Sequence, residues 1–97
     1  MKVTLLGCGT SVGVPAIGRA GWGACDPNDS RNRRQRCAVL VQSETTNVLV
    51  DAGPDIRNQL LPLGLQKIDA LLITHTHADH VAGLDDLRAF YLSLIHI

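Results

Sequence analysis

Three of the four histidines of the chain stand within one short stretch, His75-Thr76-His77-Ala78-Asp79-His80. This stretch follows an almost continuous apolar run, 68–73, which reads as a strand buried on both faces. Imidazole nitrogens and carboxylate oxygens are ligands for zinc, and they also suit manganese and iron. Because side chains two apart in an extended segment point the same way, His75 and His77 are expected to converge on one cation. Asp79 and His80 follow a turn and would face a second cation.

Two neighbouring divalent ions can lower the pKa of a shared water molecule and polarise a phosphoryl or acyl centre. The chemistry predicted for the motif is therefore metal-assisted hydrolysis. Asp79 is the candidate catalytic residue, since its carboxylate could also steer a proton. The alternative is a solvated loop in which the histidines occur by chance, but their spacing directly after a buried strand favours metal binding.

Four predicted strands and two predicted helices make up the elements that must position the motif. Strands are predicted over residues 2–6, 37–42, 47–51 and 68–73, with a hairpin turn at 43–46. A helix is predicted over 54–63, because Pro54 suits the first helical position. A further helix is expected after Leu84, where Asp85 and Asp86 favour a helix N-terminus.

Asp51 ends the third predicted strand, ahead of the histidine motif. One interpretation is that its carboxylate hydrogen-bonds to the histidine loop and orients it without binding metal. The other is that Asp51 caps the helix that follows. The two interpretations are compatible with each other.

Two loop segments carry further candidate ligands. Residues 7–15 are rich in glycine, and oriented backbone N–H groups there could hold a phosphate oxygen. Residues 31–36 contain four arginines, which could clamp a phosphate through bidentate contacts. The alternatives are a tight turn beside the sheet for the first segment and a solvated face for the second. The candidate substrate contacts are Gly9, Thr10, Ser11, Arg33 and Arg34.

Composition indicates one small globular domain. The chain has 97 residues, a net charge of zero and 45% hydrophobic residues. No stretch approaches a transmembrane span, and one basic loop without interleaved aromatic residues gives little reason to expect nucleic-acid binding. Cys8, Cys25 and Cys37 are odd in number and form no Cys-x-x-Cys pair, which predicts reduced, buried thiols in a cytoplasmic protein. Trp22 could cover the site or cap the core, and the core is favoured.

The motif at 75–80 resembles the signature of the metallo-β-lactamase superfamily of dinuclear hydrolases. The glycine-rich opening and the arginine run resemble the branch that contains the phosphoribosyl cyclic phosphate phosphodiesterases, and ribonuclease Z enzymes carry a looser version. The resemblance implies an α/β fold, the N-terminal half of an αββα sandwich, with a mixed sheet and helices on one side. Superfamily members are more than twice as long, so residues 1–97 are interpreted as a partial domain.

The resemblance also implies a reaction and its cofactors. Two divalent metal ions would be held by His75, His77, Asp79 and His80, with Asp51 orienting the loop. Zinc is the preferred metal, and manganese and iron are the alternatives. The implied activity is hydrolysis of a small cyclic phosphate ester by the full-length protein, which is a candidate homodimer. Further ligands would come from downstream segments, so the chain alone is expected to be inactive.

Three alternatives remain open at this point. Another superfamily hydrolase would act on a thioester, a lactone or RNA. An inactive fragment would bind metal without turnover, and an interaction module would bind no metal. The apolar end of the chain, residues 91–97, is interpreted as a truncated or foreign tail, and His96 is not assigned as a ligand.

Overall fold

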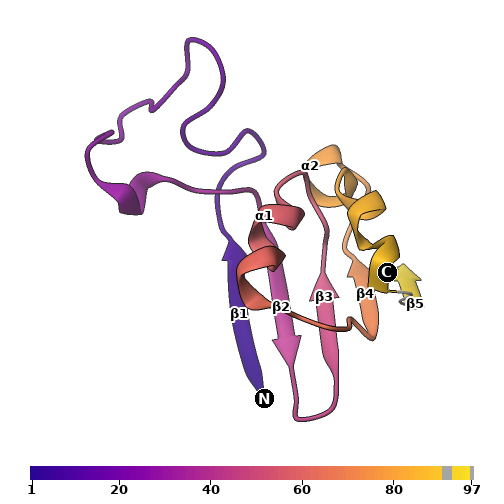
Figure 1. Ribbon diagram of the computed structural model, residues 1–97. Helices are drawn as coiled ribbons and strands as arrows, with labels where there is room; N and C mark the ends of the chain where they lie inside the picture. Colours follow the sequence, from indigo (N-terminus) through magenta and orange to yellow (C-terminus); the bar gives the residue numbers. More distant parts are fainter. Residues whose placement is uncertain (91–92, 97) are drawn as a thin grey trace.

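Five strands form one mixed sheet in the order β1-β2-β3-β4-β5, and helical segments lie over one of its faces (Figure 1). The computed structural model describes residues 1–90 and 93–96. The strands are β1 (Lys2–Gly7), β2 (Ala38–Gln42), β3 (Asn47–Val50), β4 (Ala70–Ile73) and β5 (Ser93–His96). The α-helices are α1 (Ile56–Leu60) and α2 (Ala78–Val81), and the 3₁₀ helices are η1 (Ser30–Asn32), η2 (Leu61–Leu63) and η3 (Leu84–Phe90). The predicted α/β class, a mixed sheet with helices on one side, is confirmed.

The strand directions gather the predicted functional segments at one edge of the sheet. β2 runs antiparallel to both β1 and β3, whereas β3, β4 and β5 are parallel. The C-terminal ends of β1, β3 and β4 therefore lie at the same edge as the N-terminal end of β2. The glycine-rich loop, the arginine run, Asp51 and the histidine motif all leave the sheet there, where ligand sites of α/β sheets tend to form.

The core lies between the sheet and the helices. Leu40, Leu49 and Leu71 are fully buried, and they stand opposite one another across β2, β3 and β4. Ile56 and Leu60 belong to one hydrophobic cluster with Leu49 and Leu71, because positions four apart in α1 share one face. Burial of this apolar stripe, more than helix propensity, stabilises a helix as short as α1.

The opposite face of the sheet is also apolar but remains partly open to solvent. Residues next to the buried row point to this face, since successive side chains in a strand alternate. On the edge strand β1, Val3 and Leu5 are 60% and 68% exposed. Both faces of the sheet thus carry apolar side chains, as the uninterrupted apolar runs of the strands predict.

We expect the 97-residue chain to self-associate through this open face, because contiguous exposed apolar surface drives association. Sedimentation velocity over a range of protein concentrations measures the effect. Replacing Val3 and Leu5 with threonine, which preserves strand propensity, should shift the distribution toward monomer. Ile17→Thr is the matched control, since Ile17 is fully exposed but lies outside the sheet. A wild-type chain that stays monomeric at high concentration would contradict this expectation.

The predicted helix over 54–63 begins later than expected. The α-helix starts at Ile56, and its last turn continues as the 3₁₀ helix η2. Pro54 precedes the helix and Asp55 is its N-cap residue, although the Asp55 side chain makes no capping hydrogen bond. That side chain bonds to a distant residue instead, as described below. The helix predicted after Leu84 is present as the 3₁₀ helix η3.

Residues 8–37 form an arm that projects beyond the sheet (Figure 1). Its position corrects two predictions. Cys8, Cys25 and Cys37 are exposed rather than buried. Trp22 lies outside the hydrophobic core.

At the end of the chain, Ser93–His96 pairs with β4 as the fifth strand. The interpretation of 91–97 as a tail otherwise falls on residues 91, 92 and 97, which lie outside the described part of the chain. None of the helices in the described residues is long and apolar enough to cross a membrane.

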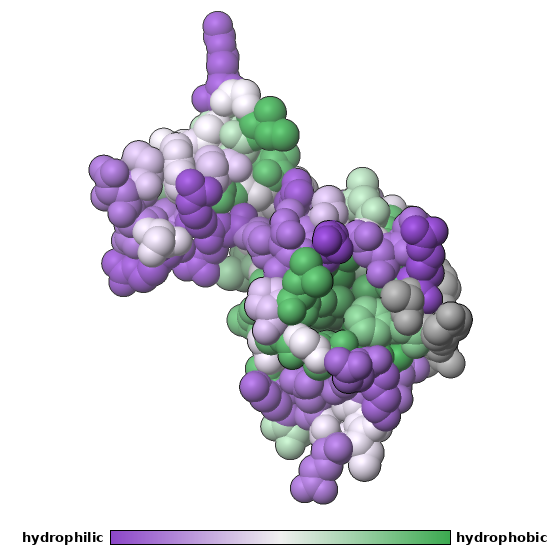
Figure 2. All heavy atoms as spheres, viewed as in Figure 1, coloured by the Kyte–Doolittle hydropathy of each residue, from purple (hydrophilic) through white to green (hydrophobic). Residues whose placement is uncertain are grey.

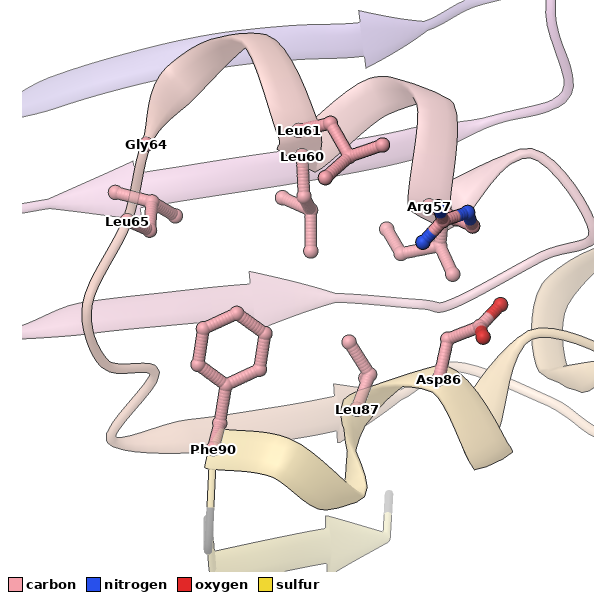
Figure 3. Close-up of a pocket in the computed structure, with 9 residues that line it drawn as sticks. Arg57, Leu60, Leu61, Gly64, Leu65, Asp86, Leu87 and Phe90 are labelled. Atoms are coloured by element: carbon pink, nitrogen blue, oxygen red, sulfur yellow. The ribbon is translucent and has the colours of Figure 1, made fainter.

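An apolar groove of about 200 Å³ lies between α1–η2 and η3. Figure 2 shows an apolar hollow rimmed by hydrophilic residues on this side of the molecule. In Figure 3, Leu60, Leu65 and Phe90 line one part of the groove, and Arg57 and Asp86 face each other at its other end. No residue of the histidine motif lines the groove, so the chemistry predicted from the sequence belongs to a different place.

Candidate metal centre

Asp51 is the centre of a hydrogen-bond network that joins β3 to the histidine motif. Its carboxylate accepts hydrogen bonds from the Thr74 backbone N–H at 2.9 Å and from Thr74 Oγ1 at 2.7 Å. His80 Nδ1 lies 2.7 Å from the same carboxylate. β3 and β4 are parallel neighbours, so their C-terminal ends bring Asp51 and Thr74 together. The α1 N-cap residue is Asp55, so Asp51 does not cap that helix.

Asp51 is almost fully buried, at 5% exposure, and has a φ of 64°. Few residue types other than Gly, Asn and Asp adopt this left-handed conformation. Burial raises the pKa of its carboxyl group, but hydrogen bonds from the Thr74 backbone, His80 and the Thr74 hydroxyl outweigh burial and hold the pKa below its ordinary value. At neutral pH the carboxylate is therefore ionised and only accepts hydrogen bonds.

This network determines which nitrogen of two histidine rings carries a proton. His80 Nδ1 must donate to the Asp51 carboxylate, because an ionised carboxylate has no proton to give. The single hydroxyl proton of Thr74 also goes to Asp51, so the 3.0 Å contact between Thr74 Oγ1 and His75 Nδ1 requires His75 to donate. In the neutral rings of His75 and His80, Nε2 then keeps its lone pair, which is the form that binds metal.

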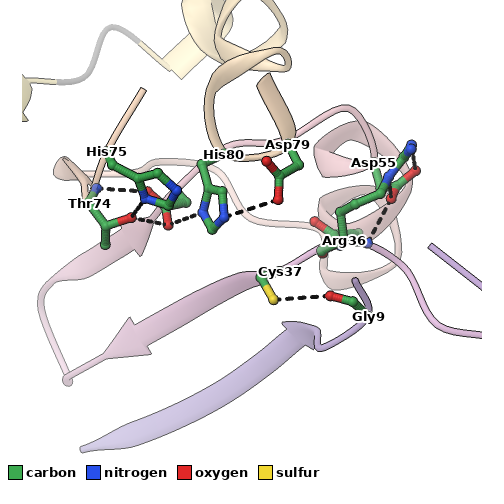
Figure 4. Close-up of polar contacts among 10 residues, drawn as sticks. Gly9, Arg36, Cys37, Asp55, Thr74, His75, Asp79 and His80 are labelled. Atoms are coloured by element: carbon green, nitrogen blue, oxygen red, sulfur yellow. Dashed lines mark hydrogen bonds and ion pairs between the residues drawn. The ribbon is translucent and has the colours of Figure 1, made fainter. Parts of the chain in front are cut away.

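The three imidazole rings of the motif lie close together. The centroid of the His75 ring is 4.6 Å from that of His77 and 4.1 Å from that of His80. The chain turns into α2 directly after His77, and this turn brings His80 back beside His75. Figure 4 shows His75 and His80 with neighbouring rings and Asp79 beyond His80.

Asp79 gives a test of whether the site suits a cation. Its Oδ2 lies 3.1 Å from His80 Nε2, on the ring nitrogen that Asp51 leaves unprotonated. His80 Nε2 and Asp79 Oδ2 are then two acceptor atoms that face and repel each other. A positive charge between them, either a proton on His80 Nε2 or a metal ion, removes this repulsion. The donor types, and the tautomers of His75 and His80, fit a pair of divalent ions, one beside His75 and His77 and the other beside Asp79 and His80. Within the described residues, no three His, Cys, Asp or Glu side chains are arranged to hold one ion, so the ligand set here is partial.

The backbone after β3 packs directly against the motif. Ala52 N–H donates to the His80 carbonyl at 2.8 Å, and Gly83 N–H donates to the Ala52 carbonyl at 2.9 Å. A Cβ atom on Gly53 would collide with the carbonyl oxygen of Asp79. The absence of a side chain at Gly53 therefore allows this approach, which fixes Asp79 and His80 relative to Asp51.

The predicted phosphate contacts of the glycine-rich loop lie on the arm. Thr10 and Ser11 are exposed. Gly9 N–H already donates to the carbonyl of Gln35 at 2.7 Å, so it cannot hold a phosphate oxygen in this arrangement.

The two predicted arginines make other contacts. The guanidinium of Arg33 lies 5.2 Å from the ring centre of Trp22. Arg34 Nη1 donates to Cys8 Sγ at 3.1 Å. No hydrogen bond or ion pair within the described residues joins Arg33 or Arg34 to the histidine motif.

Sequence reasoning missed one ordered ion pair, Arg36–Asp55. Arg36 donates to Asp55 through Nε at 2.7 Å, Nη2 at 2.9 Å and its backbone N–H at 2.9 Å (Figure 4). Gln59 Nε2 donates to the Arg36 carbonyl at 2.9 Å. The four-residue spacing of Asp55 and Gln59 places both on one side of α1. In the sequence, this spacing was the only indication that the two side chains could contact the same residue.

Comparison with known proteins identifies the family of this arrangement. Residues 46–96, more than half of the chain, match the family described as the beta-lactamase superfamily domain. The chain belongs to the metallo-β-lactamase superfamily. A solved diphosphatase of the PhnP family within the superfamily is 47% identical in sequence and superposes with a TM-score of 0.80, over 91% of this chain and 34% of that one.

Two relatives with similar sequences have different assigned functions in their names. An octanoyltransferase from Porphyromonas gingivalis is 44% identical over 89 residues, which are 91% of this chain and 18% of that protein. A ribonuclease Z from Clostridium kluyveri is 34% identical over 89 residues, or 90% of this chain and 24% of that protein. The chain thus spans about a fifth to a quarter of the length of these relatives.

We expect this superfamily chain to bind zinc weakly by itself, because the described residues do not bring three ligands to one ion. Isothermal titration should give micromolar affinity at best. His75→Ala or His77→Ala should abolish binding, whereas His96→Ala, outside the motif, serves as the control and should change little. Nanomolar affinity in the wild type would show that the chain completes its own site.

Proposed function

We propose that the protein containing this chain is a metal-dependent phosphodiesterase that acts on a small cyclic phosphate ester. The observation that carries the proposal is the Asp51 network, which leaves the Nε2 atoms of His75 and His80 as acceptors, with His80 Nε2 3.1 Å from the Asp79 carboxylate. Similarity to a diphosphatase and to a ribonuclease Z supports chemistry at a phosphorus centre.

The cofactors of the proposed enzyme are two divalent ions. Zinc is the preferred metal, and manganese and iron are the alternatives. When bound, such ions supply Lewis-acid polarisation of a phosphoryl oxygen and a nucleophile at neutral pH. His75, His77, Asp79 and His80 hold them, and Asp51 fixes the orientation of the two outer histidines. Asp79 is also the candidate for moving a proton, since its carboxylate already faces a ring nitrogen at 3.1 Å.

A second candidate is hydrolysis of an acyl thioester, which the octanoyltransferase relative brings into consideration. The match covers only 18% of that protein, so its name describes mainly residues without a counterpart here. A lactone or RNA substrate is tested together with the thioester. The proposed partner is a small phosphate ester, bound by a protein that is a candidate homodimer.

A substrate panel tests the proposal. The protein that contains this chain is loaded with zinc or manganese and offered bis(p-nitrophenyl) phosphate, a five-membered cyclic phosphate ester, an octanoyl thioester, a lactone and a structured RNA. We expect turnover of the phosphodiesters and its loss in the His77→Ala variant. Preferential turnover of the thioester would overturn the proposal, and so would phosphodiester hydrolysis that survives His77→Ala.

A further inference from the structure

Cys8 and Cys37 stand at the two ends of the arm, where the chain leaves β1 and enters β2. The residue before Cys8 pairs with the residue after Cys37, and the residue after Cys8 forms a bridge with the residue before Cys37. Directly opposed residues of neighbouring strands have Cα atoms about 4.5–5.5 Å apart. A disulfide bond spans Cα atoms about 4.4–6.8 Å apart. The backbone at the base of the arm therefore brings two thiols to a separation that a disulfide can span.

The two sulfur atoms have different hydrogen-bond partners. Cys8 Sγ accepts from Arg34 Nη1 at 3.1 Å, whereas Cys37 Sγ donates to the Gly9 carbonyl at 3.3 Å. In Figure 4 the sulfur of Cys37 points at Gly9, which is the residue that follows Cys8 in the chain. The nucleophilic form of cysteine is the thiolate, which a neighbouring arginine favours. Cys8 is therefore suited to react first, and Cys37, which holds its proton in a hydrogen bond, to react second.

Both thiols are open to a small oxidant. Cys8 and Cys37 are exposed. Cys8 also lines a hollow of about 410 Å³, together with Leu5 and Arg34. Rotation of each cysteine about χ1 exchanges one weak hydrogen bond to sulfur for a covalent bond between the two sulfur atoms.

We propose that Cys8 and Cys37 form a reversible disulfide bond in response to peroxide. The Cys8 thiolate attacks one oxygen of hydrogen peroxide, the O–O bond breaks, and the hydroxide that leaves takes up the proton that Cys8 released. Cys8 is then a sulfenic acid. The Cys37 sulfur attacks Cys8 Sγ, the S–O bond breaks, and a second water leaves with the Cys37 proton. Two thiols thus lose two electrons, which reduce one peroxide to two waters, and a dithiol reductant restores both thiols.

The disulfide closes the arm into a covalent loop. Cross-linking the two ends of a segment restricts the unfolded chain, so the oxidised protein is harder to unfold than the reduced one. The arm carries most of the glycine-rich segment 7–15 and the arginine run 31–36. Oxidation therefore keeps these two segments tied to the end of the sheet. The inference does not depend on the proposed function, because no step of it uses the metal centre.

Digestion with trypsin makes the pairing directly measurable. Cleavage after Lys and Arg yields a separate peptide for each cysteine of the chain, 3–19 with Cys8, 20–31 with Cys25 and 37–57 with Cys37. The protein that contains this chain is treated with hydrogen peroxide in the presence of EDTA, which keeps metal ions away from the thiols. Remaining thiols are alkylated, and the digest is analysed by mass spectrometry without reductant. Among these three peptides, we expect 3–19 linked to 37–57 as the main product, and its loss after treatment with dithiothreitol.

Cys25 is the matched control, because it is an exposed thiol of the same arm. Cys25→Ser should leave the link unchanged, whereas Cys37→Ser should abolish it and leave Cys8 as a sulfenic acid that dimedone traps. Oxidation should raise the melting temperature of the wild type by about 5 °C or more and should change that of Cys37→Ser little. The assignment would be overturned by absence of the link in the oxidised wild type, by equal amounts of links to 20–31, or by a link that leaves the melting temperature unchanged.

Discussion

Replacing Asp51 with alanine is expected to destabilise the chain by about 3 kcal/mol, because three hydrogen bonds to one buried carboxylate are lost together. For a domain of this size that loss lowers the melting temperature by roughly 10 °C or more. Thermal unfolding followed by circular dichroism measures the shift. Zinc binding should fall as well, since the tautomers of His75 and His80 are no longer determined.

Asp85→Ala is the matched control for this prediction. It removes the same charge, but the Asp85 side chain is 84% exposed and its distance to Arg88 is 3.6 Å. Exposed substitutions of this kind usually cost less than about 0.5 kcal/mol. An equal effect of the two substitutions would show that Asp51 does not organise the motif.

The destabilisation caused by Asp51→Ala should also depend on pH. The pKa of Asp51 is lowered in the folded protein, so between that pKa and its unfolded value the unfolded chain binds more protons. The stabilisation by Asp51 is therefore fully present above the unfolded pKa, at about 3.9, and is lost as the pH falls through the folded pKa. The difference in stability between wild type and Asp51→Ala should be largest above about pH 5 and should narrow in acid.

Replacing Gly53 with alanine is expected to have the second large effect, because the new methyl group would overlap the carbonyl oxygen of Asp79. Backbone atoms cannot rotate away as a flexible side chain can, so the motif must move relative to Asp51. Overpacking of this kind costs typically about 1–3 kcal/mol. We expect a loss at the upper end of that range, together with weaker zinc binding by calorimetry.

Gly64→Ala separates steric overlap from backbone strain. Gly64 has a φ of 61° with open space around it, so alanine there is strained without colliding. That strain costs about 1 kcal/mol and should leave zinc affinity unchanged. If Gly53→Ala binds zinc as well as Gly64→Ala does, the close packing of 51–55 on the motif has no role in the metal centre.

The elements that could be predicted are those in which local pattern and tertiary environment agree. Apolar runs bounded by Gly, Asp or Ser predicted the strands that became β1 to β4, and the direction of those strands brings the expected segments to one edge. The histidine motif and Asp51 could be placed because both follow strand ends. Which nitrogen of each ring is protonated could not be predicted, since it depends on Thr74 acting between Asp51 and His75.

The arm could not be predicted in the same way, because its contacts join residues far apart in the sequence and no local pattern indicates which residues pair. The sequence alone does not distinguish the four arginines of the run from one another. In the structure, Arg36 differs from its neighbours because it donates to Asp55. The same pairing explains why the helix begins after Asp55, whose side chain leaves the helix end to reach Arg36. Trp22 was expected to cap the core, but it lies beneath the guanidinium of Arg33.

The left-handed backbone at Asp51 limits how this position can change during evolution. Its φ of 64° admits glycine, asparagine and aspartate readily, whereas alanine, serine and glutamate are strained there. The network around it demands an acceptor for three donors, which glycine lacks and which asparagine meets with only one oxygen. Aspartate satisfies both demands, so we expect a single substitution at position 51 to disturb either the left-handed backbone or the hydrogen bonds that orient the histidine loop.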